Sequence, residues 1–222
     1  MKIISYNIHH CTQEKVDNII RRGADVCILP EMSDPATMAI PAGFNAFWTG
    51  DISWKGLGVI VRPGIQARVP DWFNPSSKYF IPLIIKGMLI IAAWPTRRES
   101  NEPKGYPQIA LEGIREYAVH FDAFPTLISG DLNLYMGQQD ETEEYSLLSF
   151  ASLLRRYGMV SAYHHITHEL FGQESVATYY HRFDESQPFF LDYTFTNIPV
   201  KRYRLVKWNA GFSDHVAQVI DI

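Results

Sequence analysis

Residues 2–31, KIISYNIHHCTQEKVDNIIRRGADVCILPE, decide the fold because they place a helix between two strands. The run KIISYNI (2–8) is rich in β-branched and aromatic residues, which favour strands. DVCILP (25–30) is almost wholly apolar, as is typical of a strand covered on both faces. Between them, residues 14–22 have apolar side chains at 16, 19 and 20, with Thr12 as N-cap and Gly23 as the stop. The chain therefore opens with a β-α-β unit.

Further strand-like runs recur along the chain. They are LGVIVR (57–62), FIPLIIK (80–86), MLIIAAW (88–94), TLIS (126–129), FFLDYTFT (189–196), residues 202–207 and residues 216–222. Residues 80–86 and 88–94 flank Lys86-Gly87, which predicts a tight hairpin in which glycine supplies a positive φ.

Two further helices are predicted, over residues 107–122 and 144–157. The first has Pro107 in its first turn, but Gly113 costs about 1 kcal/mol relative to alanine and weakens the pattern. The second is the clearer one, and Gly158 closes it. The apolar stripes are Leu111, Ile114, Ala118 and Phe121 in the first helix, and Leu147, Phe150, Ala151 and Leu154 in the second.

This order of elements predicts an α/β (α+β) fold, a four-layer sandwich. Two mixed β-sheets pack face to face and helices cover the outside. The 222 residues are 46% hydrophobic and 20% charged, which excludes disorder of the whole chain. No repeat or low-complexity linker divides the chain, so residues 1–222 are expected to form a single catalytic domain.

Composition also narrows the compartment and the partners. Twenty Lys and Arg against 24 Asp and Glu give a net charge of −4, which excludes a strongly basic nucleic-acid coat. Two cysteines are too few for disulfide bonds to stabilise a chain of this size, which favours a reducing compartment. The apolar stretch 88–94 is far shorter than the roughly 20 residues that span a bilayer. We expect a soluble, cytoplasmic monomer with no membrane partner.

Polar residues follow the apolar runs at several strand ends. Asn7 closes the first strand, Glu31 follows DVCILP, and the motifs SGDLN (129–133) and SDH (213–215) adjoin later strands. Asp192 lies inside FFLDYTF, where a carboxylate costs several kcal/mol unless it is paired or bound to a metal. Each feature alone is more often structural, but together they indicate a site held at strand ends.

These motifs, KIISYN (2–7), DVCILPE (25–31), SGDLN, LDYTF (191–195) and SDH, resemble those of the endonuclease/exonuclease/phosphatase superfamily of metal-dependent phosphoesterases. Exonuclease III-like AP endonucleases and DNase I belong to it. The resemblance spans residues 2–220 with the motifs in the same order. KGLGVIV (55–61), IIAAWPTR (90–97), YGMVSAYH (157–164) and ATYYHR (177–182) resemble a compact bacterial branch related to exonuclease III.

The resemblance implies a metal-binding role for three residues. Glu31 matches the main ligand of a divalent cation, with Asn7 and Asp214 in the surrounding metal and water shell. Such a set of oxygen donors suits Mg²⁺ or Mn²⁺ better than zinc.

The resemblance also implies catalytic roles. Asp131 matches the residue that orients or deprotonates the attacking water, and Asn133 the donor that holds water and phosphate in line. His215 matches the histidine on a non-bridging phosphate oxygen. Asp192 would then accept a hydrogen bond from the far nitrogen of His215 and set its tautomer.

Two positions depart from the family pattern. Trp94 stands where DNase I-like members have a histidine and AP endonucleases a tyrosine, and indole cannot act as an acid near neutral pH. His9 stands where AP endonucleases have an aspartate, which puts a second metal contact and the AP activity in doubt.

Several residues have both a functional and a structural interpretation. Trp94, Arg97, Tyr179 and Tyr180 are candidate substrate-binding residues, with solvated charge or packing as the alternatives. Arg98 has the same two interpretations as Arg97, substrate binding or solvated charge. Further candidates are Trp48 and Trp54 at a pocket mouth near Lys55, and a zinc site at His164, His165 and His168, for which a polar loop or surface helix is favoured.

We therefore expect a Mg²⁺- or Mn²⁺-dependent phosphodiesterase that acts on DNA, as an endonuclease or exonuclease. The alternative is a phosphatase or phosphodiesterase for a small-molecule or lipid-like phosphoester, which the acidic balance and the short chain favour. A non-catalytic binding module is the remote alternative, because the set of catalytic residues is intact.

Overall fold

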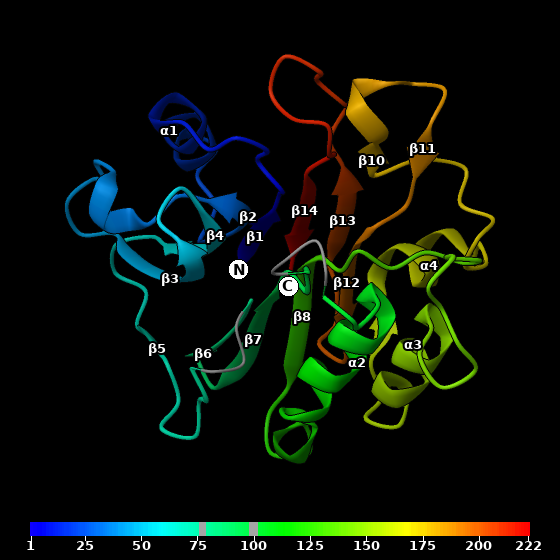
Figure 1. Cartoon of the computed structure of the whole chain (residues 1–222). Helices are drawn as coiled ribbons and strands as arrows, with labels where there is room; N and C mark the ends of the chain where they lie inside the picture. Colours follow the sequence, from blue (N-terminus) through cyan, green and yellow to red (C-terminus); the bar gives the residue numbers. More distant parts are fainter. Residues whose placement is uncertain (76–78, 98–101) are drawn as a thin grey trace.

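The structure is a computed structural model that describes residues 1–75, 79–97 and 102–222. Two six-stranded mixed β-sheets pack face to face, with helices on both outer faces (Figure 1). The expected four-layer α/β sandwich is confirmed. No helix within these ranges is both long enough and apolar enough to cross a bilayer. Arg98 lies outside the described residues.

The first sheet contains both ends of the described chain and has the strand order β13-β14-β1-β2-β4-β3. Its strands are β1 (Lys2–Ser5), β2 (Val26–Met32), β3 (Asn45–Ile52), β4 (Lys55–Val61), β13 (Arg202–Leu205) and β14 (Gln218–Asp221). Strand β1 pairs in parallel with β2, and helix α1 (Gln13–Arg21) connects the two strands, which confirms the β-α-β start. The Thr12 hydroxyl accepts a hydrogen bond from the Lys15 N–H at 3.3 Å and caps α1 as predicted.

The second sheet has the strand order β5-β6-β7-β8-β12-β9. Its strands are β5 (Ala67–Arg68), β6 (Phe80–Ile85), β7 (Met88–Ala93), β8 (Thr126–Asp131), β9 (Val160–Ser161) and β12 (Asp192–Thr196). The β6–β7 hairpin turns at Lys86 and Gly87, which both have positive φ, 51° and 77°, as the sequence predicted for the glycine. Strands β10 (Tyr179–Tyr180) and β11 (Pro188–Phe189) form a separate pair beside it.

The helices divide between the two outer faces. Helix α1 covers the first sheet, and α2 (Tyr106–Arg115), α3 (Leu147–Arg155) and α4 (Ala162–Thr167) lie along the second (Figure 1). Short 3₁₀ turns occur at Pro35–Thr37, Ala118–His120 and His181–Phe183. The Ser146 hydroxyl accepts the Ser149 N–H at 3.1 Å and begins α3.

Successive side chains of each strand point to opposite faces of the sheet, and together they fill three apolar layers. Ile3 and Ile90 point into the space between the sheets, whereas Ile4 points outward against Val16 of α1. Phe150 of α3 packs on the outer face of the second sheet. Each fully buried side chain of this size contributes about 1.5–3 kcal/mol, so the alternation fixes which face of each strand is inside.

The same alternation directs a polar side chain between the sheets. Tyr193 and Phe195 of β12 face the helices, so Asp192 and Thr194 face the opposite way. The Thr194 hydroxyl donates to Gln218 of the first sheet at 2.9 Å. The inter-sheet layer is therefore apolar over most of its length and polar beside Asp192.

Two predicted elements are each divided into two shorter ones in the structure. The expectation of one helix over 107–122 is wrong, because α2 ends at Arg115 and a 3₁₀ turn follows, with the Tyr117 N–H bonded to the Ile114 carbonyl. The run 189–196 is likewise two strands, because the Leu191 and Asp192 N–H groups both donate to the Thr178 hydroxyl between them.

Gly113, which weakened the helix prediction, has a packing reason. A Cβ on this residue would lie 2.4 Å from the ring of Phe80. The glycine therefore lets α2 approach β6 closely, and the cost in helix propensity is offset by that contact.

Candidate active site

Asn7 joins the two sheets at the polar end of their interface. It follows β1 and is only 1% exposed. Its side-chain N–H₂ donates to Oδ2 of Asp131 at 2.9 Å and to Oε1 of Glu31 at 3.4 Å. Its Oδ1 accepts the N–H of His9 at 3.0 Å. The amide thus holds a carboxylate from each sheet, and its oxygen is used within the loop.

Glu31 reaches the site because strand β2 bulges there. Pro30 pairs with Leu57 and Met32 with Gly56, so Glu31 is the extra residue, with φ of 64°. A bulge re-aims the side chain of the extra residue. The carboxylate is turned toward Asn7 and lies 3.4 Å from the ammonium of Lys55 on the neighbouring strand β4.

The motif GDLN forms the end of β8. A Cβ on Gly130 would lie 1.8 Å from the carbonyl oxygen of Ala93, so only glycine permits β7 and β8 to approach this closely. Oδ1 of Asp131 accepts the N–H of Asn133 at 3.0 Å. Asn133 has φ of 52° and donates from Nδ2 to the Pro95 carbonyl at 3.1 Å. The turn fixes both side chains at the sheet edge.

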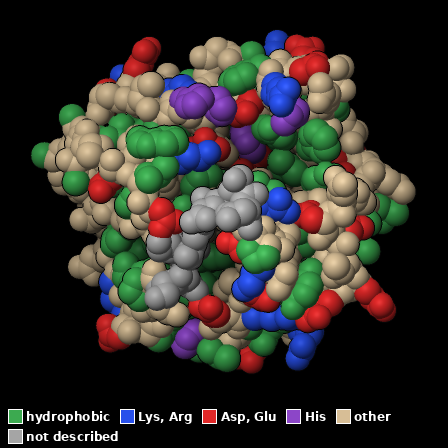
Figure 2. All heavy atoms as spheres, viewed as in Figure 1, with side chains coloured by type: hydrophobic (Ala, Val, Ile, Leu, Met, Phe, Trp, Pro, Cys, Tyr) green, Lys and Arg blue, Asp and Glu red, His purple; other side chains and the backbone are tan. Residues whose placement is uncertain are grey.

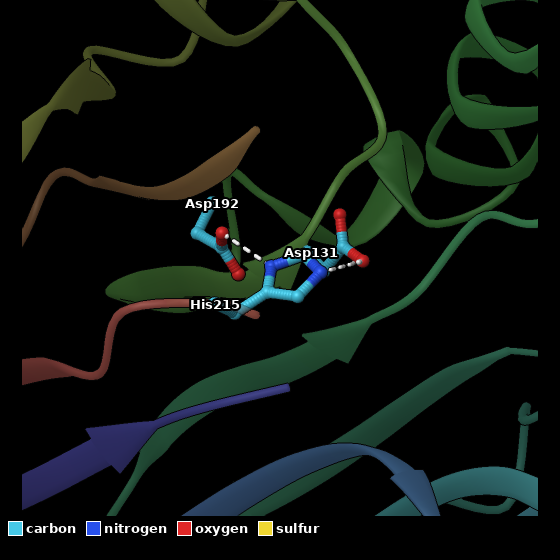
Figure 3. Close-up of side chains that lie close together, drawn as sticks. All are labelled: Asp131, Asp192 and His215. Atoms are coloured by element: carbon cyan, nitrogen blue, oxygen red, sulfur yellow. Dashed lines mark hydrogen bonds and ion pairs between the residues drawn. The ribbon is translucent and has the colours of Figure 1, made fainter. Parts of the chain in front are cut away.

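His215 lies between two carboxylates of the second sheet (Figure 3). Its Nδ1 is 2.9 Å from Oδ2 of Asp192, and its Nε2 is 3.8 Å from Oδ2 of Asp131. Its backbone N–H donates to the Ser213 hydroxyl, which itself donates to the Asn7 carbonyl at 2.7 Å. Ser213 therefore positions the SDH motif against Asn7.

The protonation states of His215, Asp131 and Asp192 follow from their burial and from their charges. Burial alone lowers the pKa of His215, but the charges of Asp192 and Asp131 outweigh burial and raise it to about 10. Burial raises the pKa of Asp131 to about 7, with the His215 charge opposing. Burial also raises the pKa of Asp192. At neutral pH His215 is therefore cationic, and Asp131 is poised to exchange a proton.

Oδ1 of Asp214 lies 4.0 Å from Nε2 of His215. Nδ1 of His9 is 3.4 Å from Oδ2 of Asp214, and the His9 side chain is 26% exposed. Burial lowers the pKa of His9, while the Asp214 and Glu31 charges oppose that shift. The backbone of His9 is left-handed, with φ of 35°, which directs its ring to this position.

The donor set fits a hard divalent cation. Four carboxylates, Glu31, Asp131, Asp192 and Asp214, meet here against the charges of Lys55 and His215. Buried carboxylates in excess over cations favour binding of a further positive charge. Within the described residues, one group of three side chains has its ligand atoms within 4.8 Å of one another, Asp131, Asp192 and His215, but a cationic His215 offers no lone pair to a metal.

The remaining candidate residues lie around this centre in different settings. Trp94 is 3% exposed, packs edge-on against Tyr79 and has the Lys55 ammonium 5.3 Å from its ring. Tyr179 lies with its ring centroid 4.6 Å from that of His215. Tyr180 instead stacks on Trp208, with the ring centroids 4.1 Å apart. Their roles toward a substrate remain predictions.

A pocket of about 880 Å³ opens beside Asn133. It is lined by Arg97, Tyr106, Asn133, Tyr135, Gln138, Gln139, Asp140, Tyr179, His181, Gln187, Phe189 and Leu191. On the face drawn in Figure 2, basic, acidic and histidine side chains gather around a hollow. Two of the lining residues contact the carboxylate cluster, because the Asn133 N–H donates to Asp131 and the Tyr179 ring packs against His215.

The three histidines of HHITH belong to α4 and its C-cap. The His164 ring is hydrogen-bonded on both nitrogens, to the Ser161 hydroxyl at 2.8 Å and to Glu174 at 3.0 Å. His168 ends the helix in a left-handed conformation. The favoured interpretation as a surface helix agrees with this arrangement, since both ring nitrogens of His164 are used within the protein.

Sequence reasoning did not identify several residues at the site. In the sequence, Lys55 was noted only as a neighbour of Trp48 and Trp54. Its contact with Glu31 depends on the bulge in β2, which no residue type in the sequence predicts. Trp54 is 61% exposed, whereas Trp48 donates its ring N–H to the Met32 carbonyl. Of the pocket walls, the sequence indicated Arg97, Asn133 and Tyr179, and the others were missed. Tyr135, two residues after Asn133, was the available signal.

Comparison with known proteins shows which solved structures have a similar fold. No family model matches the sequence, and no curated protein matches it. A 3′-5′ exonuclease (NExo) from Neisseria meningitidis matches over 100% of this chain and 99% of that chain, with a TM-score of 0.69 and 15% identity. A Neisseria 3′ phosphatase NExo bound to a product DNA hairpin matches over 100% and 98%, with a TM-score of 0.69 and 14% identity.

An AP endonuclease from Archaeoglobus fulgidus matches over 100% of this chain and 98% of that chain, with a TM-score of 0.67 and 13% identity. At these identities the likeness concerns the fold. The chain therefore has the fold of these solved exonuclease and AP endonuclease structures, as its motifs predicted.

Proposed function

We propose that this protein is a divalent-metal-dependent phosphodiester hydrolase that acts on DNA, in the manner of exonuclease III-like nucleases. One observation carries the proposal: the Asn7 amide joins Glu31 of one sheet to Asp131 of the other, beside a His215 ring held between Asp131 and Asp192. The fold shared with the Neisseria exonuclease and the AP endonuclease supports it.

We propose that Glu31 and Asp214 hold Mg²⁺ or Mn²⁺, with Asn7 positioning Glu31. When bound, such a cation would neutralise charge on the phosphate and lower the pKa of coordinated water. Lys55, 3.4 Å from Glu31, would offset part of the charge of that carboxylate when no cation is bound. The fit rests on oxygen donors and on the excess of negative charge around Asn7.

The protein residues would then divide the work of the hydrolysis. His215, cationic because its pKa is raised to about 10, would donate to a non-bridging phosphate oxygen and offset developing charge. Asp131, with its pKa raised to about 7, would take the proton from the attacking water. Asn133, fixed by Asp131 and Pro95, would hold the water in line with the leaving oxygen.

Protonation of the leaving group needs a source other than Trp94. Indole is not an acid near neutral pH, and this ring is buried against Tyr79. We propose that water at the open side of the site supplies this proton. Residues 1–222 would act as one catalytic domain, in a cytoplasmic monomer.

The test is a cleavage panel with abasic, nicked, duplex and single-stranded DNA in Mg²⁺ or Mn²⁺. Asp131→Asn should lower the rate at least about 10³-fold because it removes the proposed base, while Asp71→Asn, an exposed carboxylate outside the site, should leave the rate unchanged. Circular dichroism and thermal melting of both variants would check folding. If the wild type cleaves none of these substrates, the proposal fails.

A second candidate is a phosphomonoesterase. The observation that favours it is that one Neisseria neighbour is described as a 3′ phosphatase. Release of inorganic phosphate from 3′-phosphorylated DNA, or from nucleotides and inositol phosphates, would distinguish this activity from cleavage of an internal phosphodiester.

A further inference from the structure

The 880 Å³ pocket adjoins the proposed chemistry directly. Asn133 lines its edge, and Tyr179 forms a wall with its ring centroid 4.6 Å from that of His215. The β-bridge between Tyr179 and His215 fixes this relation through the backbone. A group that enters the pocket therefore lies next to the position of the reacting phosphate.

The walls of the pocket are aromatic. The rings of Tyr135 and Phe189 meet at 60° with centroids 5.1 Å apart, and the Tyr179 centroid is 6.2 Å from that of Phe189. All three side chains are partly exposed. Gln138 holds Tyr135 in place, since its Oε1 accepts the Tyr135 N–H and its Nε2 donates to the Asn133 carbonyl. These rings form a preformed surface on which a planar group can stack.

The rim of the pocket carries amides rather than free charges. Gln139 and Gln187 are exposed there, and Gln187 donates to Asp184 at 2.8 Å. Among the described residues of the lining, the two strong charges form an ion pair with each other, because Arg97 donates to Asp140 at 2.8 Å. Within these residues, a second phosphate would find no strong cation outside that pair. The described lining therefore favours an uncharged planar group with hydrogen-bonding edges.

We propose that this pocket receives an intact, unpaired nucleobase of the nucleotide that adjoins the scissile phosphate. This inference rests on the proposed function. A bare sugar has no π-face to stack on any of these rings, and 880 Å³ lies at the upper end of the roughly 300–1,000 Å³ typical of ligand pockets. Recognition of an extruded base by stacking and edge hydrogen bonds needs this combination of aromatic and amide groups. The substrate is thus a strand end, a single strand or a locally opened duplex.

The experiment uses DNA oligonucleotides that carry one 2-aminopurine at each position in turn, and matched oligonucleotides with a tetrahydrofuran abasic analogue there. Binding is followed by fluorescence in EDTA, and cleavage is then measured with Mn²⁺. At the cleaved position we expect a fluorescence change of at least about 2-fold, because the base leaves its own stack.

Phe189→Ala should lower kcat/KM for the intact base at least about 10-fold, and for the abasic analogue less than about 3-fold, because the lost interaction is stacking. Phe189→Leu keeps an apolar side chain without the ring and should show the same selectivity if the alanine variant folds poorly. Tyr145→Ala, an aromatic residue outside the pocket, should show no selectivity.

The outcomes separate the two proposals. Cleavage of intact and abasic substrates with equal kcat/KM, and equal losses in Phe189→Ala, would overturn the nucleobase pocket and leave the phosphodiesterase standing. No cleavage of any oligonucleotide together with no fluorescence change at any position would overturn both. A fluorescence change in EDTA that Phe189→Leu abolishes supports the pocket independently of catalysis.

Discussion

Replacing Asp192 by asparagine isolates the electrostatic effect of the carboxylate that faces His215. The two side chains are 2.9 Å apart and fully buried, and asparagine keeps the shape and an acceptor oxygen while removing the charge. Opposite charges about 4 Å apart attract by about 4 kcal/mol at an effective dielectric constant of 20. At 1.36 kcal/mol per unit, that corresponds to about 3 pKa units. The pKa of His215 should therefore fall from about 10 to about 7.

Two measurements check this fall. An NMR titration of the His215 ring nitrogens in metal-free protein reports the pKa directly, without reference to activity. The pH profile of kcat/KM should lose activity at a pH about 3 units lower than in wild type, because the imidazole deprotonates earlier. Asp71→Asn is the matched control. A His215 pKa that stays within one unit of the wild-type value in Asp192→Asn would refute the reasoning.

Three further predictions concern stability and metal binding. Burial holds the pKa of Asp131 at about 7 in the folded state, above its unfolded value. The stability that this protonated carboxyl contributes is therefore present at low pH and is lost as the pH rises from about 4 to about 7. Asp131→Asn should flatten the dependence of the unfolding free energy on pH in that range, measured by urea unfolding in EDTA. Gly130→Ala should destabilise the protein by more than 3 kcal/mol in urea unfolding, since its Cβ meets backbone 1.8 Å away, whereas Gly87→Ala, with open space around it, should cost only about 1–2 kcal/mol. Lys55→Met should tighten Mg²⁺ or Mn²⁺ binding several-fold at low salt by calorimetry, because it removes a cation beside the proposed ligand, and Lys104→Met, on an exposed surface pair, should not.

The fold could be predicted from the sequence where a residue pattern has one outcome. The β-branched run before Asn7, the Lys86-Gly87 turn and the stripe of α3 each favour one local structure, and each is present. Strand β3 was missed because NAFWTGDI is interrupted by Gly50 and Asp51 and is only partly buried. Helix α4 was predicted only as a polar loop or a surface helix, because six residues are too few for a periodic signal.

The candidate site divides in the same way. Residues in motifs, such as Asp131 and His215, could be predicted because their types and order carry the resemblance. Lys55 and Phe189 could not, because their positions depend on the bulge at Glu31 and on the β10–β11 pair, which are tertiary features. The pKa of about 10 for His215 likewise depends on distances that only the fold sets.

The pairing of β1 with β14 has a consequence for synthesis of the chain. Lys2 lies opposite Asp221, more than two hundred residues later, and Asn7 meets the SDH motif just before that final strand. Contacts between such distant segments form late in folding. A ribosome-bound chain that stops short of β14 would have an unpaired edge on β1, and Asn7 would lack His215. Under the proposed function, the chain would become competent for hydrolysis only when the first sheet closes.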